Sequence, residues 1–217
     1  MPTRLTRATM QEAAVRLAAQ DTNLRRAHRA YGPPPLWARP AGFATLVLII
    51  FEQQVSLASG RSAYQRLERL AGSVDPETVT RLGSQQLRSA GLTRQKSRYV
   101  VELASAILDT RLDLKAVARM NDDEARDALT TVPGIGRWTA NIYLLMGLRR
   151  PDVWPVYDLA LRKSFGQLRG MDHPPTDDEL ACVAMRWRPY RSVAARMLWH
   201  YYLEKRKKVA PTASGAK

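Results

Sequence analysis

The sequence predicts an all-α fold, and two observations support this prediction. Apolar residues recur at the spacing of one helix face, most clearly between residues 94 and 108. Signals for strands are missing, since no apolar–polar alternation and no Asn-Gly or Asp-Gly hairpin turn occurs in the chain. We therefore expect a series of short helices joined by turns and loops, without an internal repeat.

Capping residues predict where most of these helices begin. A side-chain oxygen at the N-cap accepts a hydrogen bond from a backbone amide that has no partner within the helix. Three capping boxes, each ending in Glu three residues after the cap, start at Thr9, Asn121 and Thr176. Further N-cap candidates are Ser56, Asp75 (before Pro76), Ser84 and Thr93.

Two segments depart from the amphipathic pattern. Residues 43–54 are long for a strand and nearly all apolar, and we interpret them as a buried helix. Residues 205–217 begin with four consecutive basic residues and contain no apolar stripe. We expect them to form a basic, disordered tail, whose charge can rest on DNA, after a last helix at residues 191–204.

The net charge of the chain limits the kinds of molecule that we expect it to bind. Its 217 residues include 34 Lys and Arg against 20 Asp and Glu, which gives a net charge of +14. A basic surface of this size favours a polyanion, either nucleic acid or an anionic membrane; a charge that serves solubility is the alternative. The basic residues do not gather on one face of an amphipathic helix, which argues against a membrane.

Cysteine and histidine usage excludes several kinds of site. The single cysteine, Cys182, rules out a disulfide within the chain and a cysteine-ligated zinc or iron–sulfur cluster. The three histidines lie far apart in sequence, without the spacing of metal ligands. No segment resembles a signal peptide, and the most apolar run, residues 43–51, is too short to span a bilayer. We expect a cytoplasmic, nucleoid-associated protein.

A glycine turn at residues 132–136, Val-Pro-Gly-Ile-Gly, carries the first functional signal. Helical patterns flank it on both sides, so the sequence predicts a helix-hairpin-helix. Glycines let a ligand approach the backbone closely, and the free amides of the following helix attract an anion such as a DNA phosphate. A turn that only connects two helices is the alternative. The predicted DNA contacts are Gly134, Gly136, Arg137 and Thr139.

The carbonyl groups of the same turn are candidate ligands for a monovalent cation. Such an ion, K⁺ or Na⁺, would bridge the turn to a phosphate of the DNA backbone. The candidate carbonyls belong to Thr130, Val132 and Ile135.

The motifs of the chain resemble those of a known family. PGIGRWTAN followed by PDVWPVYDLALRKSF resembles the helix-hairpin-helix-GPD superfamily of DNA glycosylases, closest to its AlkA-like branch, the 3-methyladenine DNA glycosylases II. FEQQVS, GLTRQKSRYVVELA and WRPYRSVAARMLW resemble three further motifs of that branch, in the same order. The matching stretches span about residues 40–202.

The resemblance implies a two-lobed helical fold with a cleft between the lobes. One lobe would contain about residues 1–40 and 150–204, and the other about residues 41–149, including the hairpin at 131–137. Larger members of the branch carry an additional N-terminal β-rich domain. We expect that domain to be absent, because only a short helical leader precedes residue 40.

The resemblance also identifies a catalytic residue. In the family, the acid directly before the Leu of the second motif is catalytic, and Asp158 matches it. Breaking an N-glycosidic bond builds positive charge on the sugar, which a carboxylate stabilises while it orients or deprotonates the attacking water. From spacing alone, a helix-capping role for Asp158 is the alternative. Asp152, the competing carboxylate, matches a loop position and is expected to be structural.

Aromatic residues complete the predicted site. A purine alkylated at N3 or N7 is already a cation, so it leaves without a general acid and binds well to electron-rich ring faces. Trp138 and Trp199 match aromatic pocket positions of the branch, and Tyr143 and Tyr157 are further candidates. A place in the core is the alternative for each. Tyr157 departs from the family, which usually has a small or acidic residue there, and would reshape the pocket.

Two further expectations follow from the resemblance. Bifunctional relatives carry a lysine at the position of Trp138, where it forms a Schiff base and cleaves the strand. A tryptophan cannot do so, which implies a monofunctional enzyme without AP lyase activity. The wedge that fills the gap left by an extruded base matches Gln54, for which helix capping is the alternative.

Three basic residues, Arg94, Lys96 and Arg98, are either a solvated face or contacts to the DNA backbone.

The sequence thus predicts a monomeric glycosylase of base excision repair. It would bind double-stranded DNA, flip out an alkylated purine such as 3-methyladenine or 7-methylguanine, and hydrolyse its N-glycosidic bond with Asp158 and no organic cofactor. One alternative is a non-catalytic helix-hairpin-helix module that binds DNA. Another is a glycosylase for deaminated or oxidised bases, which are neutral and gain less from an aromatic pocket.

Overall fold

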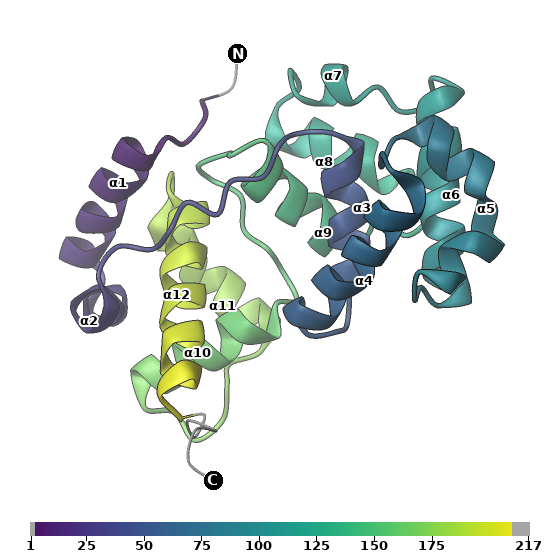
Figure 1. The fold of residues 1–217 in the computed structure, drawn as a ribbon. Coiled ribbons are helices and arrows are strands. Elements are labelled where there is room, and N and C mark those ends of the chain that lie inside the picture. The colour runs from purple at the N-terminus through teal and green to yellow at the C-terminus, as the bar shows by residue number, and fades with distance from the viewer. Residues whose placement is uncertain (1–2, 210–217) are drawn as a thin grey trace, which may run out of the picture. The chain divides into compact units, whose positions relative to one another are not determined.

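A computed structural model of the protein describes residues 3–209 and shows helices throughout (Figure 1). No strand occurs among these residues, which confirms the all-α prediction. The chain divides into two compact units. The first contains Ala38–Arg150, and the second contains Arg4–Trp37 together with the described chain from Pro151 to Val209. No helix within residues 3–209 is long and apolar enough to cross a membrane.

The first unit is built around the buried helix α3, Phe43–Glu52. Eight of its ten side chains are buried, as predicted from its apolar sequence, although the helix ends before Gln53 rather than at Gln54. It packs against α4, α6 and α9. The other helices of this unit are α4 (Leu57–Ala71), α5 (Pro76–Ser89), α6 (Arg94–Leu108), α7 (Leu114–Val117), α8 (Asp122–Thr130), α9 (Arg137–Ile142) and a π-helical turn (Tyr143–Gly147).

The caps of this unit agree with the sequence. Ser56, Asp75, Thr93 and Asn121 each cap the helix that follows, and Asn121 forms the predicted capping box with Glu124. The short helices predicted after Asp75 and Ser84 are two halves of α5, which bends at Gly83, where φ is +65°. The four-residue helix α7 and the π-helical turn were not predicted, because segments this short have no periodicity.

The second unit surrounds the long helix α12, Arg191–Val209, which packs against α1, α2 and α10. The buried guanidinium of Arg196 donates to the carbonyls of Leu36 and Ser192, and burial lowers its pKa to about 9. The indole of Trp187 donates to Asp21, the cap of α2, over 3.0 Å. The remaining helices are α1 (Arg7–Gln20), α2 (Thr22–Tyr31), α10 (Leu159–Arg169), α11 (Asp177–Ala184) and a 3-10 turn (Met185–Trp187).

Two sequence predictions for this unit are corrected. The first helix is capped by Thr6 rather than Thr9, because Thr9 lies in the first turn, where its hydroxyl accepts a hydrogen bond from the backbone amide of Thr6. The disordered tail predicted for 205–217 is wrong for residues 205–209, which continue α12. Three of their basic side chains contact acidic or aromatic partners one turn back along the helix, and Lys208 contacts Tyr31 on α2. The rest of that predicted tail lies outside the described residues.

Candidate active site and nucleic-acid interface

The first unit carries the glycine turn between α8 and α9, and its two glycines have different roles. At Gly134, φ is +91°, and an added Cβ would lie 2.2 Å from Cγ of Tyr99. At Gly136, φ is −84°, and nothing lies within 4 Å of an added Cβ. Gly134 is therefore required by the packing of the turn on α6. Gly136 leaves open space in front of the first amides of α9, where Arg137 is exposed.

Gln53 ties the loop after α3 to this turn. Its side-chain Nε2 donates to the carbonyl of Gly134 and to Oγ1 of Thr139, both over 2.9 Å. Thr139 is only 2% exposed and its hydroxyl accepts from Gln53, so its side chain has a structural role, while its contact with DNA stays a prediction. Sequence reasoning missed Gln53, although the paired glutamines of FEQQVS were a signal for it.

Lys96 holds the start of the same loop. Its ammonium donates to the carbonyls of Phe51 and Gln53, over 3.0 and 2.7 Å, at the C-terminal end of α3. Partial burial lowers the pKa of Lys96. Lys96 is therefore a structural residue, whereas its neighbours Arg94 and Arg98 are exposed.

Gln54, the predicted wedge, lies at the tip of this loop. It is exposed and has a φ of +54°, in the left-handed region that residues other than glycine rarely occupy. Such a conformation costs about 1–2 kcal/mol and persists only where the surroundings impose it. The backbone contacts of Lys96 and Gln53 provide that constraint. Apolar side chains follow directly, with Val55 and Leu57 each 48% exposed.

The predicted cation ligands belong to a turn with its own hydrogen bonds. The carbonyl of Val132 accepts from the amide of Ile135 over 3.1 Å. A carbonyl oxygen has a second lone pair, so this bond leaves the Val132 carbonyl able to bind an ion. Among the described residues, no cluster of three or more His, Cys, Asp or Glu side chains could hold a metal.

The aromatic candidates of the first unit divide into two kinds. Trp138, the second residue of α9, is half-buried. Tyr143 is 1% exposed, and its hydroxyl accepts a hydrogen bond from the amide of Gly42 over 3.0 Å. Burial raises the pKa of Tyr143. The ring of Tyr143 belongs to the core of the unit, which argues against its predicted role in binding the base.

The second unit carries Asp158 as the N-cap of α10. Its Oδ1 accepts from the amide of Leu161 over 3.0 Å and from the indole Nε1 of Trp199 over 3.2 Å. The carboxylate is half-buried. The capping role considered from the sequence is thus present, and it orients the side chain. Trp199 is 8% exposed, so its indole acts as a donor to the acid and offers little free surface for stacking.

Tyr157 and Leu159 flank this acid and are exposed. Tyr157 is 68% exposed with a φ of +63°, and Leu159 is 54% exposed. Asp152 lies in the preceding loop and pairs with Arg191 over 3.0 Å and with Arg188 over 3.2 Å. It also accepts from the backbone amide of Arg191 at the start of α12. Asp152 is structural, as predicted, whereas Tyr157 leaves its ring open to a ligand.

The family assignment follows from the whole chain. Residues 47–189 match the family model of the HhH-GPD superfamily base excision DNA repair proteins. This protein therefore belongs to the HhH-GPD superfamily, as its motifs predicted.

Relatives with similar sequences are named as 3-methyladenine glycosylases. A putative DNA-3-methyladenine glycosylase of Bacillus subtilis is 26% identical over 186 residues, covering 82% of this chain and 65% of the relative. A DNA-3-methyladenine glycosylase of the same organism is 30% identical over 172 residues, covering 74% of this chain and 57% of the relative. The chain thus spans less than two thirds of the length of either relative.

Solved structures show the same fold. The 3-methyladenine DNA glycosylase of Schizosaccharomyces pombe in complex with abasic DNA has a TM-score of 0.79 at 23% identity, covering 95% of this chain and 100% of that one. A DNA-3-methyladenine glycosidase of Bacillus halodurans has a TM-score of 0.73 at 29% identity, covering 90% and 91%. This chain therefore has the helical architecture of DNA glycosylases.

Proposed function

We propose that this protein is a monofunctional DNA glycosylase that releases alkylated purines, of the 3-methyladenine and 7-methylguanine type, from double-stranded DNA. The observation that carries the proposal is the placement of Asp158 at the head of α10, where two N–H donors meet one carboxylate oxygen. The two donors fix the orientation of the carboxylate. Such a carboxylate suits a reaction that develops positive charge.

The proposed reaction begins with a base flipped out of the duplex. The C1′–N bond of the sugar breaks, and its electron pair neutralises the cationic purine, which leaves without a general acid. Asp158 stabilises the positive sugar and takes a proton from the water that attacks C1′. No organic cofactor takes part. The exposed ring of Tyr157, next to Asp158 in sequence, is the proposed stacking surface for the base. In the first unit, the half-buried ring of Trp138 is the aromatic surface proposed to contact the substrate.

The DNA-binding part of the proposal rests on the first unit. The open space at Gly136 and the exposed Arg137 suit a phosphate of the backbone, which a K⁺ or Na⁺ ion held by turn carbonyls would bridge. Gln54, at the tip of its constrained loop, is the proposed wedge. Trp138 occupies the position where a lysine would be needed for strand cleavage, which supports a hydrolase without AP lyase activity. We further propose that the protein acts as a monomer in the cytoplasm.

A base-release experiment tests the proposal. Duplexes containing 3-methyladenine, 7-methylguanine, hypoxanthine or 8-oxoguanine would be incubated with the wild type, Asp158→Asn and the control Asp172→Asn, which changes an exposed carboxylate of the same unit. We expect release of the two alkylated bases by the wild type and the control, and a loss of at least about a hundredfold in Asp158→Asn. Strand breaks should appear only after alkali.

Other results would reject specific parts of the proposal. Release of alkylated bases by Asp158→Asn at the wild-type rate would contradict the mechanism. A preference for hypoxanthine or 8-oxoguanine would identify the enzyme as a glycosylase for deaminated or oxidised bases. DNA binding without release of any base would identify a non-catalytic module.

A further inference from the structure

The C-terminal turns of α12 carry basic and aromatic side chains that the proposed reaction does not use. Nζ of Lys205 lies 5.6 Å from the ring centroid of Tyr201, and Cζ of Arg206 lies 5.4 Å from that of Tyr202. Arg206 also donates to the Tyr202 hydroxyl over 2.9 Å. Each cation follows its ring by four residues, so the two side chains of each pair lie on the same helix face.

A second helix completes this arrangement. Tyr31, the last residue of α2, contacts the ring of Tyr201 edge-on, with 5.7 Å between the centroids. Nζ of Lys208 lies 4.9 Å from the ring centroid of Tyr31. The cluster therefore joins segments that are far apart in sequence but packed together within one unit. We name Tyr31, Tyr201, Tyr202, Lys205, Arg206 and Lys208 the α12 basic cluster.

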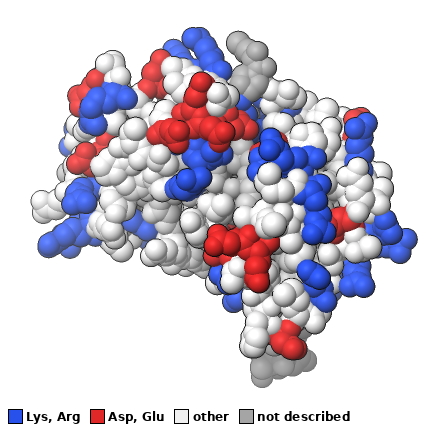
Figure 2. Space-filling view, turned by 180° about the vertical axis from the view of Figure 1, so that it is seen from behind, with Lys and Arg blue, Asp and Glu red and all other residues white. Residues whose placement is uncertain are grey.

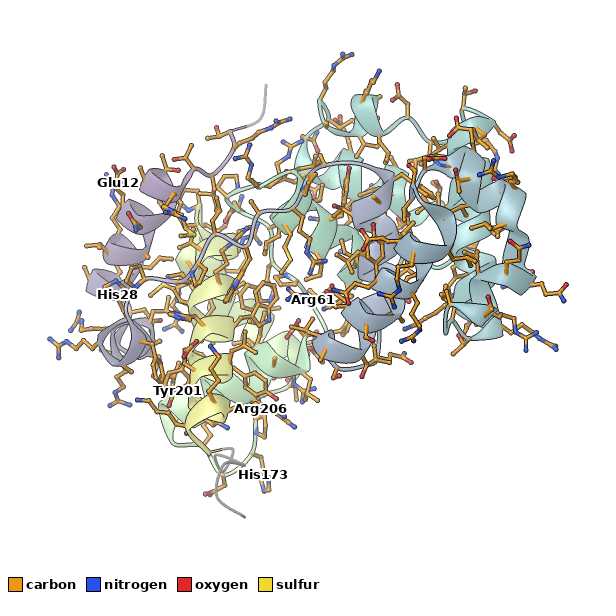
Figure 3. The ribbon with its side chains drawn as sticks, in the orientation of Figure 1. Glu12, His28, Arg61, His173, Tyr201 and Arg206 are labelled. Atoms are coloured by element: carbon orange, nitrogen blue, oxygen red, sulfur yellow. The ribbon has the colours of Figure 1, made fainter. Side chains whose placement is uncertain are left out.

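The cluster has two sides. Figure 3 shows Tyr201 and Arg206 extending from opposite sides of α12, with Tyr201 directed toward α2. Helix periodicity places Arg206 on the same face as Trp199, the residue that donates to Asp158, and about 10 Å further along the axis. The face of α12 that holds the proposed catalytic acid therefore continues to a cation.

The aromatic rings hold the basic side chains of this cluster in place but do not neutralise their charge. Within the described residues, the salt bridge of α12 beyond residue 198 joins Glu204 to Lys207 over 2.6 Å. His200 lies 4.0 Å from Glu204, and burial lowers the pKa of this histidine. The hydrogen bond from Lys207 lowers the pKa of Glu204. Three further cations, Lys205, Arg206 and Lys208, lie over rings, and of these Lys208 also contributes to the lowered pKa of Glu204. A ring restrains a cation without cancelling its charge, so the cation keeps its attraction for an anion.

This arrangement differs from the general charge of the protein. In Figure 2, Lys and Arg side chains are scattered over the face that is drawn, among small groups of Asp and Glu. Scattered charge attracts any polyanion but forms no defined site. Basic side chains interleaved with aromatic rings on one ordered element are typical of nucleic-acid contacts.

We propose that the α12 basic cluster binds the phosphate backbone of duplex DNA, as a contact additional to the glycine turn. The inference builds on the proposed function, because it takes DNA as the substrate. Lys205, Arg206 and Lys208 are the residues that bind phosphate, and the three tyrosines hold them in place. A role limited to helix stability, in which the cations offset the partial negative charge at the end of α12, predicts a different outcome.

The test compares two triple variants with the same change of charge. One is Lys205→Gln/Arg206→Gln/Lys208→Gln, and the control is Arg4→Gln/Arg7→Gln/Arg16→Gln, which removes three exposed arginines from the same unit. Fluorescence anisotropy would measure the Kd of each full-length protein for an undamaged duplex across a range of salt concentrations. The slope of log Kd against log salt reports the number of phosphates that the protein neutralises.

We expect the cluster variant to lower that slope by about 3, or about one unit for each phosphate that it no longer neutralises, and the control to change it much less. Equal slopes in the two variants would overturn the proposal, because they would show an effect of net charge alone. A fall in the melting temperature of the cluster variant with an unchanged slope would show the helix-stability role and overturn it too.

Two further measurements distinguish phosphate binding on DNA from membrane binding and from catalysis. Binding to phosphatidylserine vesicles that disappears in the cluster variant, with an unchanged DNA slope, would identify a membrane surface and reject the proposal. The salt titration measures DNA binding and does not depend on base release. If the protein releases no base but the cluster variant lowers the slope, the proposed DNA contact stands and the proposed glycosylase activity is rejected. If the protein releases alkylated bases but the cluster variant leaves the slope unchanged, the α12 contact with DNA is rejected and the proposed glycosylase activity stands.

Discussion

The indole Nε1 of Trp199 donates a hydrogen bond to Oδ1 of Asp158 over 3.2 Å, joining residues 41 positions apart in sequence. The amide of Leu161 donates to the same oxygen over 3.0 Å. Helix α12 thus orients a carboxylate that the start of α10 presents. An aromatic residue that the sequence suggested as a stacking surface is, in the folded unit, a partner of the proposed catalytic acid.

Replacing Trp199 with Phe should lower catalysis more than binding. The substitution keeps an aromatic ring in the core but removes the N–H donor to Asp158. A hydrogen bond to a charged group contributes about 1.5–3 kcal/mol, so kcat should fall by about tenfold to a hundredfold. Single-turnover release of 7-methylguanine would measure the rate, and anisotropy would measure the Kd for the same duplex. A rise in Kd at an unchanged rate would contradict the positioning role.

The two turn glycines should respond differently to alanine. Gly134→Ala forces a Cβ to within 2.2 Å of the Tyr99 ring at a φ of +91°, which should cost about 2–5 kcal/mol of unfolding free energy. Gly136→Ala meets open space and should cost about 1 kcal/mol or less.

DNA binding should also respond to the change at Gly136. The added methyl group of Gly136→Ala would occupy the space proposed for a phosphate and should weaken duplex binding in a folded protein. Urea unfolding and anisotropy on both glycine variants would measure the two effects. Wild-type affinity in Gly136→Ala would show that the turn serves only to connect α8 and α9.

Substitutions at the adjacent residues Gln53 and Gln54 should affect different properties, the first the free energy of unfolding and the second the rate of base release. Gln53→Leu removes the donor to the Gly134 carbonyl and to the buried Thr139 hydroxyl, which should cost about 1–3 kcal/mol of unfolding free energy. Gln54→Gly relieves a left-handed φ and should leave the unfolding free energy unchanged or higher.

The wedge proposed for Gln54 predicts slower base release in Gln54→Gly despite its stability. Urea unfolding and single-turnover release on the two variants would measure the contrast. A Gln54→Gly enzyme with wild-type release would remove Gln54 from the proposed mechanism. An unaltered unfolding free energy in Gln53→Leu would show that the loop does not depend on its bond to the turn.

Tyr157→Asn tests the exposed ring beside the acid. Asparagine adopts left-handed backbone more readily than tyrosine, so the variant should be as stable as the wild type or more stable by about 1 kcal/mol. Loss of cation–π stacking, worth about 0.5–2 kcal/mol, should reduce kcat/KM for 7-methylguanine by about twofold to thirtyfold. Release of neutral hypoxanthine serves as the control. An equal loss for both bases would show that the ring does not select cationic bases.

Local signals explain the parts of the fold that sequence reasoning predicted correctly. The caps at Ser56, Asp75, Thr93 and Asn121 act within one helical turn, so their residue types specify the helix starts directly. The unbroken apolar run of α3 likewise requires burial. The end of α12 was misjudged because its stability comes from cation–π and ion-pair contacts to residues one turn away and to Tyr31 on another helix.

By itself, the sequence determined the helical class, the superfamily and the positions of the glycine turn and Asp158, because short motifs and periodicity encode these features. Only the tertiary structure decided which side chains contact the glycine turn and Asp158. It buried Tyr143 in the core, directed Trp199 to Asp158 and joined Gln53 to Gly134 across 81 residues. An aromatic or amide side chain can pack, donate or stack, and the choice depends on partners that lie far away in sequence and come together only on folding.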